Sequence, residues 1–152
     1  LMAGTVAAAT KRTLIGLLAA DPGRPADTQV EYGFPGRTLE RAVIYAGKIS
    51  GDVQLASMAG PTGRVSRRED LMLDLHIAAT TPGESDTAVV EDQVCEAAEF
   101  VAHFVAGNPT LDGSVDGLKL IRVAGIELDS DVEDESAVAV LTLKLAIMSH
   151  IR

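Results

Sequence analysis

The stretch from Leu118 to Ile151 constrains the fold more than any other part of the chain. It predicts a strand from Leu118 to Leu128, a charged turn over residues 129–136, and a long closing strand. In the closing strand two sets of side chains alternate, Leu141, Leu143, Leu145 and Ile147 with Val140, Thr142, Lys144 and Ala146. A period of two is typical of a strand buried on one face, because a helix spaces its apolar residues by three and four. The stretch therefore predicts the last hairpin of a sheet whose apolar face must be covered by other elements of the chain.

Two amphipathic helices are expected to provide that cover. The first spans residues 5–20 and ends where Asp21-Pro22-Gly23 cannot continue it. The second spans Asp86 to Ala106, with Ser85 or Asp86 as its cap and Gly107 and Pro109 at its end. Its apolar stripe is Val90, Val94, Ala97, Val101, Phe104 and Val105, and its polar side is Asp92, Glu96, Glu99 and His103.

The remaining strands lie between the two helices. Alternation predicts a short strand at residues 29–34, a second at residues 41–47, and a continuation of the sheet at residues 51–59 after a turn. Residues 60–68 are expected to form a loop or exposed arm. The next strand spans Glu69 to Ala79, where Leu71, Leu73, Leu75 and Ile77 face one way and Asp70, Met72, Asp74 and His76 face the other.

These elements predict an α+β fold. The expected architecture is a mostly antiparallel sheet with two helices packed on one face, plus an exposed hairpin or arm. The 152 residues suit a single domain, 1–152, and a hydrophobic content of 47% excludes a disordered chain. The apolar runs are too short for a membrane helix, and the N-terminus lacks the order of a secretory signal.

The charge of the chain is unevenly distributed. Residues 1–83 carry 9 basic and 8 acidic groups, whereas residues 84–152 carry 4 basic and 14 acidic groups, and the whole chain has a net charge of −9. An acidic half disfavours binding along nucleic-acid phosphates, and 3% aromatic residues supply few surfaces for base stacking. A solvated face that aids solubility is the simplest interpretation of this acidic half.

Cys95 is the only cysteine, which excludes an intramolecular disulfide and suits a reducing compartment.

The sequence contains no catalytic motif, and we expect neither an enzyme nor a cofactor. His76, His103 and His150 are far apart and are predicted to be surface residues, and Cys95 is predicted to be a small buried or half-buried thiol. In the charged turn Asp129, Asp131, Glu133 and Glu135 have the rhythm of a calcium loop. However, Asp134 occupies the position where such a loop needs glycine, so we predict no metal site.

Three arginines, Arg64, Arg67 and Arg68, lie within five residues. They have three interpretations: a solvated loop, a partner for an acidic face on another copy, or an anion site. A chain with a basic arm and an acidic half suits head-to-tail assembly into a closed ring. These arginines are therefore the candidate subunit interface.

Taken in order, the segments resemble the tail terminator (tail completion) proteins of long-tailed bacteriophages, particularly those of actinobacterial hosts. The resemblance covers nearly the whole chain and depends on order and spacing, since no single motif is specific. It is carried by residues 32–36 (YGFPG), 40–47 (ERAVIYAG), 67–69 (RRE) before the alternating strand, the helix 91–105 with 108–111 (NPTL), and the acidic turn leading into 137–143 (AVAVLTL).

The resemblance implies a non-enzymatic virion protein assembled in the host cytoplasm. In this family a homohexameric ring caps the tail tube, ends its polymerisation and joins the tail to the head connector or stopper protein, and genomic DNA passes through the ring. An acidic channel wall would let DNA slide. Its candidates are Asp129, Asp131, Glu133, Asp134 and Glu135, or the polar side of the 86–106 helix. The alternatives are another neck protein, or a small ligand-binding or hydrolytic domain with a pocket between sheet and helices.

Overall fold

The computed structural model describes residues 5–34, 36, 42–57 and 66–151, and it has the predicted α+β fold. The chain order is helix α1 (Ala7–Ala20), strands β1 (Thr28–Glu31), β2 (Ala42–Ser57) and β3 (Ser66–Thr81), helix α2 (Thr87–Gly107), a short 3₁₀ helix η1 (Leu111–Gly113), and strands β4 (Leu118–Glu133) and β5 (Ser136–Ile151). None of the helices among these residues is long and apolar enough to cross a membrane.

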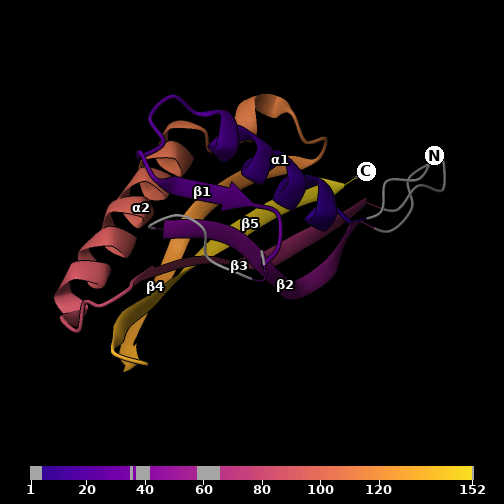
Figure 1. The fold of residues 1–152 in the computed structure, drawn as a ribbon. Coiled ribbons are helices and arrows are strands. Elements are labelled where there is room, and N and C mark those ends of the chain that lie inside the picture. Colours follow the sequence, from indigo (N-terminus) through magenta and orange to yellow (C-terminus); the bar gives the residue numbers. More distant parts are fainter. Residues whose placement is uncertain (1–4, 35, 37–41, 58–65, 152) are drawn as a thin grey trace.

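The five strands form one sheet in the order β1-β2-β3-β5-β4. β1 pairs with β2 in parallel, through Thr28–Glu31 and Ala42–Tyr45, and every other pairing is antiparallel. β5 lies between β3 and β4, and its alternate residues are buried along its whole length, as the sequence predicts. Figure 1 shows the long β4–β5 hairpin extending past α2 at the lower left, far from the C-terminal end of β5.

Both helices cover the same face of the sheet (Figure 1). α1 packs on β1 and β2, whereas α2 packs on β2, β3, β4 and β5. The two helices share one hydrophobic core with the inward side chains of the strands. The largest fully buried members of this core are Leu14, Leu18, Ile44, Leu73, Leu75, Ile77, Leu111, Ile121, Leu141, Leu145 and Ile147.

Local chemistry fixes the boundaries of α2. The Asp86 side chain accepts a hydrogen bond from the Ala88 N–H at 3.0 Å, which caps the helix start as predicted. Its end lies one residue later than predicted, because Gly107 is still helical and Asn108 is the cap. The Asn108 side-chain amide donates to the Phe104 carbonyl at 2.9 Å, which satisfies one of the last helical acceptors.

β2 corrects the prediction of two strands separated by a turn. It is a single 16-residue strand that pairs with β3 across an irregularity between Ala46 and Ile49. A β-bulge absorbs the one extra residue of β2 there without reversing the chain. Gly51 is needed further along, because a Cβ atom at this position would overlap the backbone oxygen of Asp70 on β3. Gly51, the first residue of the predicted continuation, therefore allows the two strands to approach closely.

The short first strand is also displaced from its prediction. β1 ends at Glu31, so Tyr32, Gly33 and Phe34 follow the strand instead of completing it. Tyr32 and Phe34 are exposed, and the Phe34 ring lies edge-on to Tyr45 with a centroid distance of 5.4 Å. The alternation of Val30, Tyr32 and Phe34 thus combines one strand residue with two aromatic residues outside the sheet.

Candidate functional site

The acidic turn predicted at residues 129–136 is mostly a strand. Asp129, Asp131 and Glu133 belong to β4 and pair with β5, and the turn contains just Asp134 and Glu135. Both turn residues have positive φ, 50° and 64°, as a two-residue hairpin turn requires. The five predicted channel residues therefore form an acidic row and tip on a projecting hairpin.

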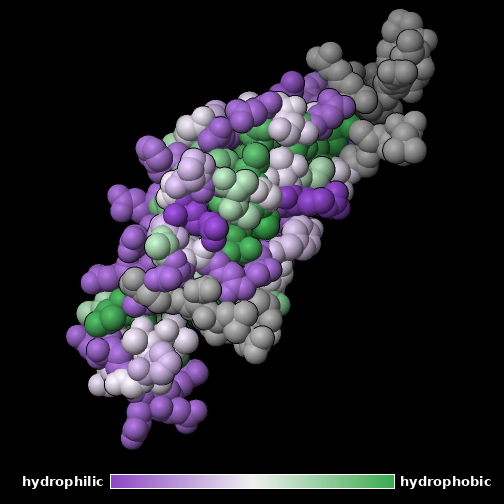
Figure 2. Space-filling view, turned by 45° about the horizontal axis from the view of Figure 1, so that its top comes forward, coloured by the Kyte–Doolittle hydropathy of each residue, from purple (hydrophilic) through white to green (hydrophobic). Residues whose placement is uncertain are grey.

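The outer half of β4, residues 126–133, is amphipathic. Ile126, Leu128 and Val132 lie opposite Leu143, Leu141 and Ala137 of β5, so they point to the helix-covered face of the sheet. α2 does not cover them, and their exposed fractions are 62%, 45% and 43%. The other face of this segment carries the acidic row Glu127, Asp129, Asp131 and Glu133. Figure 2 shows hydrophilic side chains gathered at the lower-left end of the molecule, with a small hydrophobic area beside them.

One contact anchors this segment to the helix layer. The Ser130 hydroxyl donates to the Glu91 carboxylate of α2 at 3.0 Å. Ser130 lies on the same face as Ile126 and Leu128, because it is opposite the buried Ala139 of β5. The start of α2 thus reaches β4 at the level of Ser130, and the neighbouring apolar side chains stay open to solvent.

The arginine cluster is only partly inside the described residues. Arg64 lies outside them, whereas Arg67 and Arg68 belong to β3, where a loop or arm was predicted. Arg68 forms an ion pair with Asp70 of the same strand at 3.4 Å. This contact is between exposed side chains and therefore leaves the Arg68 charge accessible to a partner.

The strand that pairs with Arg67 and Arg68 also exposes apolar side chains. Val53 and Leu55 of β2 are 58% and 66% exposed and lie opposite Glu69 and Arg67 of β3. Because Glu69 is buried with the core, Val53 and Leu55 point to the helix-covered face. We call residues 46–57 of β2 the free part of β2, since β1 pairs with β2 only as far as Tyr45.

The sheet therefore has two open margins within the part of the chain that the structure describes. No described strand pairs with the outer edge of β4 on one side, and none pairs with the outer edges of β1 and of the free part of β2 on the other. Unpaired strand edges are templates for pairing with another chain. Sequence reasoning predicted a ring interface from charge alone and missed these margins. The sequence feature that could have indicated the β4 margin is the alternation of Ile126, Leu128 and Val132 with the acidic residues of the same segment.

A small polar and aromatic cluster lies on the sheet face opposite the helices. The Tyr45 and His76 rings lie 5.2 Å apart, and His76 Nδ1 is 3.0 Å from the Thr142 hydroxyl. Burial raises the pKa of the Tyr45 phenol above its ordinary value.

The three histidines differ in exposure. His76 and His150 are half-buried, and among the three only His103 is well exposed, so the prediction of three surface histidines is correct for one.

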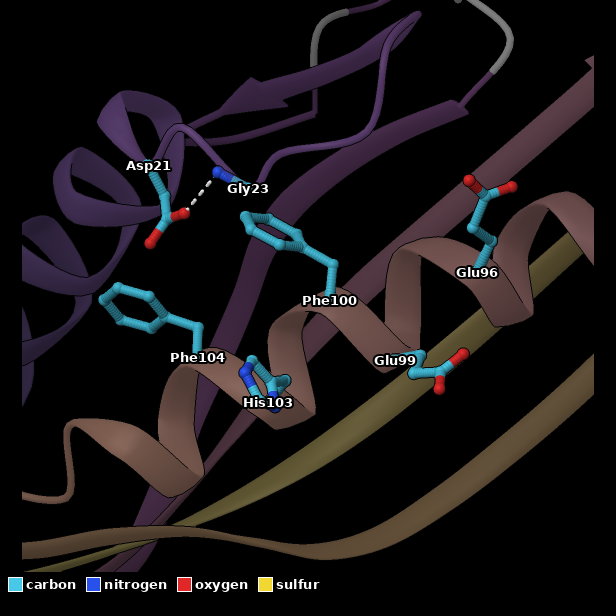
Figure 3. Close-up of a pocket in the computed structure, with 7 residues that line it drawn as sticks. All are labelled: Asp21, Gly23, Glu96, Glu99, Phe100, His103 and Phe104. Carbon is cyan, nitrogen blue, oxygen red and sulfur yellow. Dashed lines mark hydrogen bonds between the residues drawn. The ribbon is translucent and has the colours of Figure 1, made fainter.

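An open hollow of about 310 Å³ lies between the end of α1 and α2. It is lined by Asp21, Gly23, Glu96, Glu99, Phe100, His103 and Phe104. Figure 3 shows Phe100 and Phe104 pointing toward the segment that follows α1, while Glu96 and Glu99 point in other directions. Its polar groups do not converge on one point, so this hollow gives the ligand-binding alternative little support.

Two further predictions concern reactive groups. Cys95 is exposed, which corrects the prediction of a buried or half-buried thiol. It follows the fully buried Val94, and one step along a helix turns the side chain about 100° away from the sheet. Among the described residues, no group of three or more histidine, cysteine or acidic side chains is arranged to hold a metal ion.

Comparison with known proteins finds a likeness among solved structures. No protein-family profile matches the chain, and no curated protein sequence matches it. Among solved structures, the fold is similar to a chain in the structure titled "Virion of native gene transfer agent (GTA) particle", with a TM-score of 0.51 and 15% identity. The match covers 97% of this chain and 100% of that chain. At this identity the likeness shows a shared fold over nearly the whole of the given chain.

Proposed function

We propose that this chain is a structural, non-enzymatic virion protein of a long-tailed bacteriophage, and specifically a tail terminator. The observation that carries the proposal is the likeness to a chain of a virion, which covers 97% of this chain and 100% of that chain. The resemblance of the sequence to tail terminators is independent support, since it depends on the order of local segments and not on the fold.

In this proposal the protein acts as a homohexameric ring at the neck of the virion. The ring caps the tail tube, stops its polymerisation and presents its other surface to the head-tail connector or stopper protein. The two open margins of the sheet support ring formation, because they are two different edges with which no described strand pairs. A heterologous contact between unlike surfaces closes into a ring when its rotation allows.

The acidic row suits the wall of a DNA channel. Asp129, Asp131 and Glu133 share the sheet face that carries no helices, and Asp134 and Glu135 extend the charge to the hairpin tip. Carboxylates repel DNA phosphates, so genomic DNA would pass without sticking. We propose this hairpin as the channel wall in preference to the polar side of α2.

Tube growth in vitro tests the proposal. The tail tube protein of the same phage is allowed to polymerise, and its growth is followed by light scattering with and without this protein. The expected result is that substoichiometric amounts stop elongation, because each ring blocks one tube end. Unchanged growth at a molar excess would contradict the terminator function.

A further inference from the structure

We infer that the outer half of β4 in one subunit pairs with the free part of β2 in a second copy of this chain. The inference rests on the proposed ring and names the surfaces that close it. The two segments are residues 126–133 and residues 46–57, and the sheet would then run on from one subunit into the next.

The strand directions permit this pairing. β2, β3, β5 and β4 are each antiparallel to their neighbour, so β2 and β4 of one chain run in opposite directions. A second copy with the same side of its sheet facing outward presents its β4 antiparallel to the β2 of the first. The backbone groups of both edges can then form an antiparallel ladder.

The apolar side chains of the two segments match across such a ladder. Ile126, Leu128 and Val132 point to the helix-covered face of β4, and Val53 and Leu55 point to the helix-covered face of β2. In a head-to-tail contact with the two copies offset by about 25 Å along the strands, these rows meet on the same face of the continuous sheet. Cross-strand apolar pairs of this kind stabilise a sheet, and here they would remove five exposed side chains from water.

The charges favour a contact between β4 of one copy and β2 of another over a symmetric contact between two β4 strands. Pairing two β4 edges would bring Glu127, Asp129, Asp131 and Glu133 of one copy against the same four carboxylates of another. Like charges on paired strands are destabilising. The free part of β2 instead carries one exposed lysine, Lys48, and one carboxylate, Asp52, and the neighbouring Arg68 of β3 is ion-paired with Asp70 at 3.4 Å. The β2 margin is therefore the better electrostatic partner for β4.

Cysteine cross-linking tests the pairing directly. Val53→Cys and Leu128→Cys are introduced together into a Cys95→Ser protein, assembled on tail tubes, and treated with a short bis-maleimide. Within one chain the two positions lie at the levels of Ser149 and Leu141 of β5, roughly 25 Å apart along the strands. A short linker therefore cannot join them inside one subunit. The two single-cysteine proteins are the matched controls.

The expected result is a ladder of covalent multimers up to the size of the ring, formed by the double variant alone. Each single-cysteine control should stay monomeric, because the inferred contact never brings two like positions together. Rings that form normally but give no ladder would overturn the pairing and leave the proposed function intact. The absence of any assembly from wild-type protein and tubes would overturn both.

Discussion

The side chain of Glu69 accepts a hydrogen bond from the backbone N–H of Val6 at 3.0 Å, although 63 residues separate them. Val6 is the N-cap of α1, and Glu69 is 2% exposed on the inner face of β3. The same carboxylate oxygen accepts from the Ser149 hydroxyl of β5 at 3.2 Å. One buried carboxylate thus ties the start of α1 to two central strands, where the positive end of the helix dipole favours its charge.

Replacing this carboxylate should destabilise the protein. Glu69→Ala leaves the Val6 N–H and the Ser149 hydroxyl without their acceptor, which costs about 2–4 kcal/mol of unfolding free energy. Urea unfolding measures the change. Asp70→Ala is the matched control, since Asp70 makes an exposed ion pair with Arg68 and should cost less than about 1 kcal/mol. Equal losses in the two variants would contradict the anchoring role of Glu69.

Two glycine-to-alanine changes should have opposite effects. Gly51→Ala forces β2 away from β3, because the new Cβ meets the Asp70 backbone, and it should lower the melting temperature. Gly16→Ala lies at an exposed position inside α1 with open space around it, and it should stabilise the helix by about 0.5–1 kcal/mol. Thermal unfolding of both variants checks the signs. A gain in stability from Gly51→Ala would show that the strands do not approach as described.

The hairpin tip should become more stable with glycine. Glu135 adopts a φ of 64°, which costs energy for a residue with a Cβ, so Glu135→Gly should raise stability by roughly 1 kcal/mol. Glu133→Gly removes the same charge from the last residue of β4 and should lower stability instead. Calorimetry compares the two proteins. If both changes lower the melting temperature equally, the turn assignment is wrong.

The acidic row should keep DNA from adhering to the ring. Asp129→Asn, Asp131→Asn and Glu133→Gln together remove three carboxylates from the proposed channel wall, and DNA retention by assembled rings should rise because repulsion is lost. A filter-binding assay at low salt measures retention. The matched control removes three charges from the polar side of α2, with Asp92→Asn, Glu96→Gln and Glu99→Gln. If DNA retention rises in the α2 control alone, the channel wall is the polar side of α2 and not the β4 hairpin.

Local periodicity explains what could be predicted from the sequence. β5, β3 and α2 were predicted closely because each carries a long, regular alternation or stripe facing one core. β2 was divided in error, since Gly47 and Gly51 resemble turn residues until the neighbouring strand that they approach is known. Acidic residues favour turns in general, and pairing with β5 overrides that preference at Asp129 and Asp131.

The candidate site was harder to predict than the fold. Whether Ile126 or Leu55 is exposed depends on where α1 and α2 end over the sheet, and this is a property of the packed molecule. The sequence did show that acids and arginines are separated along the chain. It did not show that Arg67 and Arg68 lie in a strand beside an open margin, because that margin depends on where β1 stops pairing.

Electron microscopy of this protein mixed with its tail tube protein tests the central claim most directly. The account predicts tubes capped at one end by a ring, and a measured mass of about six subunits for rings released from the tubes. Tubes with two bare ends, together with a protein that stays monomeric at every concentration of tube, would contradict it.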